Sequence, residues 1–273
     1  GVHFLPDDPP HTIARKALRV NLSDLAAKGA TPAGFLLTLA LRSADPAFLQ
    51  PFAAALGQDA ASYRCPLLGG DTVSTPGPLM ISVTAFGRVP PGRMVRRDRL
   101  RAGDLIVVSG TIGDAALGLD VLQGRLTELM TDQQAFLIDR YRQPQPRSAL
   151  AAAVRDHAGA AMDVSDGLAG DLAKLCAASG VSATINAGAV PLSAAGRAAL
   201  GQAGLARLLS GGDDYEILCG VAADAIDSFK AAAAAAGVPV TVIGTATEGA
   251  APPQFLDSDQ RPIALKRTSF SHF

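Results

Sequence analysis

The sequence of 273 residues lacks several signals that would point to common protein classes. It has only three scattered cysteines, Cys65, Cys176 and Cys219, and no Cys-x-x-Cys pair, which argues against a zinc site or a disulfide framework. We expect them to be buried thiols in a reducing cytoplasm. No apolar run is long enough to span a membrane, and residues 1–6 do not have the pattern of a signal peptide.

An excess of charge of one sign is also lacking, since the formal net charge is −1 at pH 7. Such a chain is not expected to bind nucleic acid by non-specific electrostatics. The sequence has no Walker A loop, no kinase-type glycine loop and no dinucleotide fingerprint. Neither a Ser/His/Asp arrangement nor a reactive cysteine stands out. A bound nucleotide would therefore have to be held through acidic residues and magnesium.

What is present is a large share of hydrophobic residues, 48%, which is enough for a substantial core. Periodicity predicts helices near residues 10–30, 47–62, 113–119, 131–141, 147–156, 168–179, 193–201 and 224–236, and strands near 79–86, 104–110, 181–186, 217–221 and 238–243. A basic, Pro/Gly-marked linker follows the first predicted strand. We predict a fold of mixed α and β elements in two layers, split near residue 98.

The most informative motif is Asp163-Val-Ser165-Asp166, which follows a short apolar run and precedes the helix predicted at 168–179. Two carboxylates and a hydroxyl in one tight turn suit a hard cation such as Mg²⁺. The alternative is that Ser165 or Asp166 caps the helix while the other acid interacts with the helix dipole. This motif alone leaves both interpretations open.

A Gly-Gly-Asp sequence occurs twice, at residues 69–71 and 211–213. Paired glycines between a strand and a loop let the backbone approach a phosphate closely, but the same sequence is common in ordinary turns. The second copy begins a run of three acids in four residues, Asp213, Asp214 and Glu216, which are costly to bury without partners. For this run taken by itself we favour a solvated turn before the strand at residue 217.

The first predicted helix contains Asn-Leu-Ser-Asp at residues 21–24. Asp24 stands four residues before Lys28, so an ordinary i,i+4 ion pair would explain it. However, Asn, Ser and Asp prefer caps and turns to helix interiors, so a cluster of them favours a site. His3 and the Arg96-Arg97 pair are further candidates, although a lone histidine is usually structural and a basic run is usually a solvated surface.

Taken in order, these segments resemble the thiamine-monophosphate kinase family of the aminoimidazole ribonucleotide synthetase-like superfamily. The matching stretches are residues 1–6, 16–27, 69–72, 110–114, 142–147, 162–168, 210–216 and 271–273. The resemblance covers almost the whole chain. It implies an α+β fold, the superfamily's two-domain α/β sandwich of mixed or antiparallel sheets flanked by helices. The first domain, residues 1–98, would bind ATP and Mg²⁺, and the second would comprise residues 99–273. It also implies transfer of the γ-phosphate of ATP to thiamine monophosphate, several Mg²⁺ ions and a homodimer.

By the same resemblance, each candidate residue has an expected role. Metal ligands would be Asp24, Asp71, Asp163 and Asp166; ATP contacts would be Gly70, Asp71, Arg97 and Ser165; substrate contacts would be His3, Asp213 and Phe270. Catalytic roles would fall to Asp71, Asp166 and Arg97. The acceptor phosphate is already ionised at neutral pH, so catalysis needs positioning and charge neutralisation rather than a strong base.

The family also has a Gly-Asp-Asp loop and a Thr-Asp pair upstream of its first matching segment, and this sequence, which starts at Gly1, does not contain them. We therefore expect the sequence to be a fragment with weak or no kinase activity and an altered dimer surface. Two alternatives remain open. One is another ATP-dependent synthetase of the superfamily, of the selenophosphate or aminoimidazole ribonucleotide type. The other is a non-catalytic protein that binds a nucleotide or a thiamine phosphate.

Overall fold

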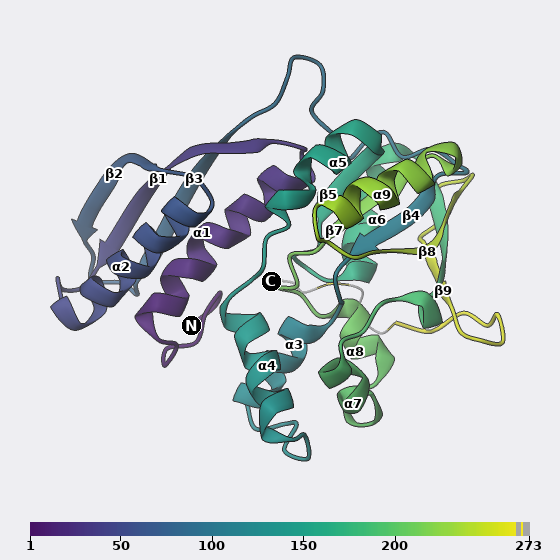
Figure 1. The fold of residues 1–273 in the computed structure, drawn as a ribbon. Coiled ribbons are helices and arrows are strands. Elements are labelled where there is room, and N and C mark those ends of the chain that lie inside the picture. Colours follow the sequence, from purple (N-terminus) through teal and green to yellow (C-terminus); the bar gives the residue numbers. More distant parts are fainter. Residues whose placement is uncertain (266–268, 270–273) are drawn as a thin grey trace.

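The structure is a computed structural model that describes residues 1–265 and 269. Its first sheet has three strands in the order β2-β1-β3, with β1 parallel to β2 and antiparallel to β3. The elements of this part are α1 (Pro10–Ala27), β1 (Thr31–Leu41), α2 (Pro46–Ser62), β2 (Leu67–Ser74) and β3 (Met80–Arg88). Both helices cover the same face of the sheet (Figure 1). The core between the helices and the sheet contains Leu18, Leu22, Phe35 and Phe52.

The second sheet has six strands in the order β5-β7-β4-β8-β6-β9, all antiparallel except the β6–β9 pair. Its strands are β4 (Leu105–Ser109), β5 (Ala158–Asp163), β6 (Ser182–Asn186), β7 (Ile217–Val221), β8 (Val240–Thr247) and β9 (Gln254–Leu256). Side chains of α6 (Leu168–Ser179) pack on one face, and those of α5 (Ala151–His157) and α9 (Ile226–Ala235) belong to the core on the other.

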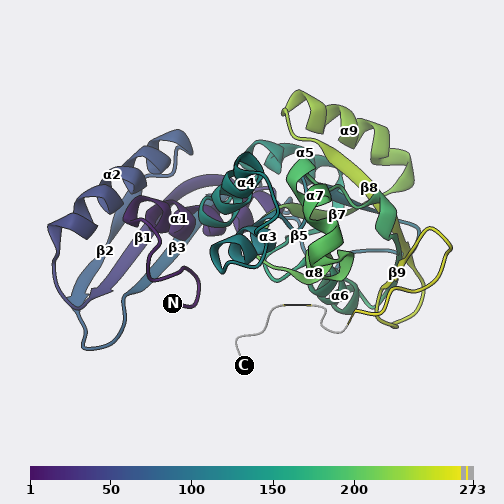
Figure 2. The ribbon, with the colours of Figure 1, turned by 90° about the horizontal axis from the view of Figure 1, so that it is seen from below.

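The remaining helices form a group beside the second sheet (Figure 2). They are α3 (Asp114–Leu122), α4 (Thr131–Arg142), α7 (Ala194–Ala203) and α8 (Leu205–Ser210), and they have a small core of their own around Leu117, Leu137 and Leu208. Within the described residues, none of the helices is both long and apolar enough to cross a bilayer.

The two parts of the chain meet along α1, which contacts α4, α5, β5 and β7. Residues 89–104 connect β3 to β4, and this connecting segment lies between α1 and β5. The Val95 amide donates to the carbonyl of Lys28 at 3.2 Å, and Arg96 forms a parallel bridge with Ala160. The C-terminal part of α1, the connecting segment and the end of β5 therefore converge, and each carries predicted site residues.

The structure confirms the two mixed, helix-flanked sheets and most of the predicted elements, with helix 168–179 and strand 217–221 at their predicted bounds. The expectation that Gly69-Gly70-Asp71 forms a loop is wrong, because β2 continues to Ser74 and Asp71 pairs with Thr38 of β1. A Cβ at position 70 would lie 1.7 Å from the Leu37 carbonyl oxygen. Glycine is required there by the close approach of two strands and not by a turn.

Candidate active site

Five of the predicted site residues line one cavity of about 270 Å³. They are Asp24, Arg97, Asp163, Ser165 and Asp166. Asp24 comes from α1, Arg97 from the connecting segment, and the other three from the end of β5 and the turn that follows. Asn21 also lines this cavity, so the Asn-Leu-Ser-Asp cluster of the first helix contributes two side chains, Asn21 and Asp24, to its wall.

Asp24 and Asp163 form a pair of carboxylates with incomplete neutralisation. Burial, and then repulsion by Asp24, raises the pKa of Asp163 to about 7, although a hydrogen bond from Ser23 opposes this. Desolvation likewise raises the pKa of Asp24, against the opposing charges of Lys28 and Arg97. Two acids that repel each other in a cavity are a donor set that suits a divalent cation such as Mg²⁺.

The simple ion pair between Asp24 and Lys28 is not what the structure contains. The Lys28 ammonium group donates to the carbonyl oxygen of Ala161 at 3.0 Å and acts on Asp24 only at longer range. It thereby ties α1 to β5 and leaves the carboxylate of Asp24 facing the cavity.

The capping interpretation of the motif at 163–166 is wrong. The N-cap of α6 is Gly167, with a φ of 113° and no side-chain cap, where a Cβ would lie 2.7 Å from the backbone of Ser210. The buried Asp171 in the first turn of α6 accepts hydrogen bonds from the amides of Ser165 and Asp166, at 2.9 and 2.8 Å. Asp171 therefore fixes the turn, and the side chains of Ser165 and Asp166 face the cavity, where Asp166 pairs with Lys174.

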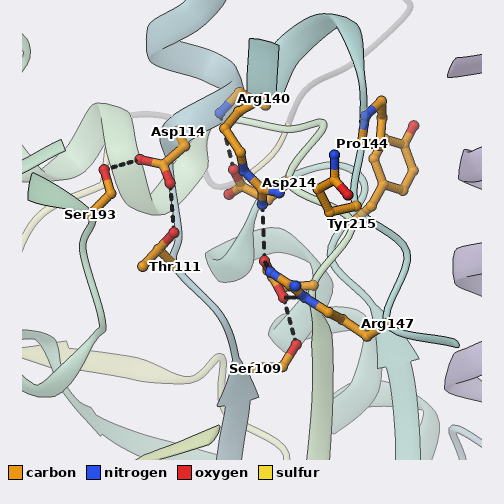
Figure 3. A network of polar contacts seen from close by, with 12 residues as sticks. Ser109, Thr111, Asp114, Arg140, Pro144, Arg147, Ser193, Asp214 and Tyr215 are labelled. Carbon is orange, nitrogen blue, oxygen red and sulfur yellow. Dashed lines mark hydrogen bonds and ion pairs between the residues drawn. The ribbon is translucent and has the colours of Figure 1, made fainter. Parts of the chain in front are cut away.

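The interpretation of residues 211–216 as a solvated turn is also wrong, because Asp214 and Glu216 are buried and hydrogen-bonded. Figure 3 shows Asp214 in the polar network that also contains Ser109, Arg140 and Arg147. Asp214 accepts the amides of Gly113 and Ala115 at the start of α3, at 2.7 and 3.2 Å. Glu216 binds the guanidinium groups of Arg140 and Arg147 and accepts a 2.7 Å hydrogen bond from Ser109. These partners offset the cost of burying the two acids.

The alternate residues of the same loop, Asp213 and Tyr215, line a second cavity of about 830 Å³ together with His3. Both have positive φ, 74° and 52°, a conformation that non-glycine residues adopt rarely and mainly where the surroundings impose it. The apolar wall of this cavity includes Ile13, Ala17, Val20, Ile81 and Val83. Asn21 and Tyr215 line both cavities, so the two are adjacent.

Two predicted site residues, Gly70 and Asp71, do not line either cavity. Gly70 and Asp71 lie exposed on β2, the strand at the sheet edge remote from the six-stranded sheet (Figure 1). Phe270 lies outside the described residues. Among the described residues, no three His, Cys, Asp or Glu side chains form a group able to hold a metal. The four-aspartate ligand set therefore stays a prediction.

Sequence reasoning missed Lys16, Lys174 and Tyr215. Lys174 and Tyr215 line the smaller cavity, and Lys16 and Tyr215 line the larger one. One signal was available for Lys16, which lies three residues after the buried apolar residue Ile13 and therefore on the same side of the first helix. A lysine on the buried stripe of an amphipathic helix needs a partner, and that requirement marks it for attention.

Comparison with known proteins identifies the family of this chain. Residues 1–89 match the family described as AIR synthase related protein, N-terminal domain, and residues 101–252 match the corresponding C-terminal domain. Thiamine-monophosphate kinase of Caulobacter vibrioides is 46% identical over 91% of this chain and 71% of that protein.

The chain belongs to the thiamine-monophosphate kinase family.

Solved structures of thiamine-monophosphate kinases share the fold. The enzyme from Stenotrophomonas maltophilia K279a matches with a TM-score of 0.88 at 40% identity, over 96% of this chain and 83% of that one. AaThiL complexed with AMPPCP and TMP matches with a TM-score of 0.87 at 30% identity, over 100% of this chain and 84% of that one. The expected superfamily fold is thereby confirmed, while the domain boundary predicted at residue 98 falls between the two matched ranges and stays a prediction.

Proposed function

We propose that this chain catalyses the ATP-dependent phosphorylation of thiamine monophosphate to thiamine diphosphate. The observation that carries the proposal is the adjacency of two cavities, one acidic and one largely apolar, in a chain that matches thiamine-monophosphate kinases along almost its whole length. A donor phosphate in the first and an acceptor phosphate entering from the second would meet at their junction, beside Asn21 and Tyr215.

In this proposal the smaller cavity receives the phosphates of ATP. The complex of AaThiL with AMPPCP supports ATP as the co-substrate. Arg97 and Ser165 would contact phosphate oxygens, since a guanidinium group and a hydroxyl are suitable donors to them. Asp24, Asp163 and Asp166 would hold Mg²⁺, which when bound neutralises phosphate charge. These assignments follow from the donor types and their shared cavity.

The larger cavity would receive thiamine monophosphate. Its apolar wall suits the flat rings of thiamine, and the Asp213 carboxylate suits the positive charge of the thiazolium. His3 lines the same cavity. Phe270, expected to pack against this substrate, remains part of the proposal. Because the acceptor oxygen is already ionised, the chain's own contribution is to position both phosphates and to exclude water between them.

We also propose that the protein is a homodimer of the cytoplasm, where its three buried free thiols would stay reduced. The face of the first sheet opposite α1 and α2 would form the interface. Exposed apolar side chains gather on its strands, namely Leu36, Leu68, Val73, Met80 and Phe86. An apolar surface of this kind is typical of an interface. Asp71 lies on β2 of this sheet and would come close to a second copy.

The test is an ADP-release assay with thiamine monophosphate, ATP and Mg²⁺, with the product identified by chromatography. It should be run on this chain and on a version extended with the N-terminal segment of the Caulobacter relative. We expect thiamine diphosphate to be formed, and we expect Asp163→Asn to lower its rate of formation by at least about a hundredfold. Binding of both substrates by both versions without any turnover would replace the kinase assignment with a non-catalytic binding role.

A further inference from the structure

Lys16 is a buried cation that the proposed reaction does not use. It lies on α1 with its side chain only 7% exposed, and its Nζ is 2.8 Å from Oδ2 of Asp213. The same ammonium group stands 3.7 Å from the centre of the Tyr141 ring, on α4. Burying a lysine is costly, so a lysine held by a carboxylate and an aromatic face has a defined position.

The carboxylate of Asp213 is held through both of its oxygens. Lys16 binds Oδ2, and the hydroxyl of Tyr215 donates to Oδ1 at 3.2 Å. Asp213 remains 32% exposed at its side chain and lines the 830 Å³ cavity with both of its partners. The two contacts therefore fix the direction of the carboxylate without closing it off from the cavity.

The backbone beneath this arrangement is held in place as well. Asp213 and Tyr215 both have positive φ, and the residues next to them, Asp214 and Glu216, are anchored in the second part of the chain. Lys16 reaches Asp213 from the first part, 197 residues away in sequence. The contact thus joins the two parts of the chain at the wall of the larger cavity.

We propose that Lys16 and Tyr215 are positioning residues that aim the Asp213 carboxylate at a cationic heteroaromatic ligand in the larger cavity. This rests on the proposed function, in which that ligand is thiamine monophosphate. Lys16 does not touch the transferred phosphate in this role. It acts through Asp213, and its removal therefore affects one substrate and not the other.

The experiment compares Lys16→Met with the wild type and with Lys230→Met, which removes an exposed lysine on α9. Lys16→Met should raise KM for thiamine monophosphate about tenfold while KM for ATP changes less than about twofold. Lys16→Arg should restore part of the loss, and Tyr215→Phe should raise the same KM by roughly threefold. Lys230→Met should match the wild type.

A double-mutant cycle separates positioning from general destabilisation. In an Asp213→Asn background, Lys16→Met should add less than about twofold to KM for thiamine monophosphate, because the group it positions is gone. Equal effects on both substrates, or the full loss in that background, would overturn the proposal. If neither the wild-type chain nor its extended version makes thiamine diphosphate, the proposed kinase is refuted instead, and titration calorimetry of thiamine monophosphate with the same variants then decides the role of Lys16.

Discussion

Some residues of the candidate site place like charges close together, which lowers the stability of the folded protein. Asp163 is the clearest case, since its carboxyl is buried beside Asp24 and its pKa is raised to about 7. Ser23 supplies a hydrogen bond, and Arg97 and Lys28 lower the repulsion only from a distance. Groups perturbed in this way by burial and a like charge are common at functional sites.

When a chelator keeps metal ions away, the raised pKa of Asp163 makes the stability of the folded protein depend on pH. The folded pKa lies above the ordinary value of 3.8, so the unfolded chain loses this proton first as the pH rises, and the folded state is progressively destabilised between about pH 4 and pH 7. Asp163→Asn should therefore raise the free energy of unfolding by roughly 1–4 kcal/mol at pH 8, with a smaller gain at pH 5.

Urea titrations in EDTA at the two pH values measure this effect. Asp224→Asn, at an exposed position, serves as the control and should show no such difference. Added Mg²⁺ should stabilise the wild type more than Asp163→Asn. A wild type that is the more stable protein at pH 8 in EDTA would contradict the interpretation of Asp163.

At the scale of elements, the position of the site depends on contacts made by neighbouring elements. The turn after β5 is held by Asp171, from the first turn of α6. Asp171→Ala would leave the amides of Ser165 and Asp166 without this acceptor, and we expect it to lower the free energy of unfolding by about 2–4 kcal/mol. The matched control is Asp227→Ala in the first turn of α9, where only the helix-dipole contribution of about 0.3–1 kcal/mol is lost.

Chemical denaturation gives both numbers, and KM for ATP should rise only for Asp171→Ala, because Ser165 lies in the turn that Asp171 holds. Losses of equal size in the two variants would show that Asp171 acts through the dipole alone.

Elements with regular hydrophobic periodicity, such as α6 and β7, can be predicted from the sequence. Elements that contain residues typical of turns cannot. Strand β1 begins with Thr31-Pro32 and contains Gly34, and because proline and glycine are typical of turns the sequence does not predict a strand there. The structure nevertheless pairs β1 on both sides. The partners of Glu216 could not be predicted either, because Arg140 and Arg147 lie 76 and 69 residues away and the fold alone brings them together. The acidic residues themselves can be identified from the sequence, because carboxylates close to apolar segments need partners or ligands.

At the scale of the whole molecule, Asp71 does not line the acidic cavity of its own copy, and in a homodimer it could serve the cavity of the other copy. If Asp71 of one copy serves the cavity of the other, a dimer of one Asp71→Asn copy and one Asp163→Asn copy has one intact site. Mixing the two inactive variants after unfolding and refolding should then recover about a quarter of the wild-type activity.

Light scattering should confirm that the wild type is dimeric, and each variant refolded alone is the control. No recovery from a mixture that is shown to contain mixed dimers would mean that Asp71 and Asp163 act within one copy.

The alternation of anchored and cavity-facing residues in the loop at 213–216 also bears on how a ligand is received. Asp214 and Glu216 hold the backbone while Asp213 and Tyr215 face the cavity, so the recognition surface is formed before any ligand arrives. Binding there requires little loss of conformational entropy from this loop, which favours affinity. The rate of association at this end of the cavity should then be set by diffusion and access and not by a search through loop conformations.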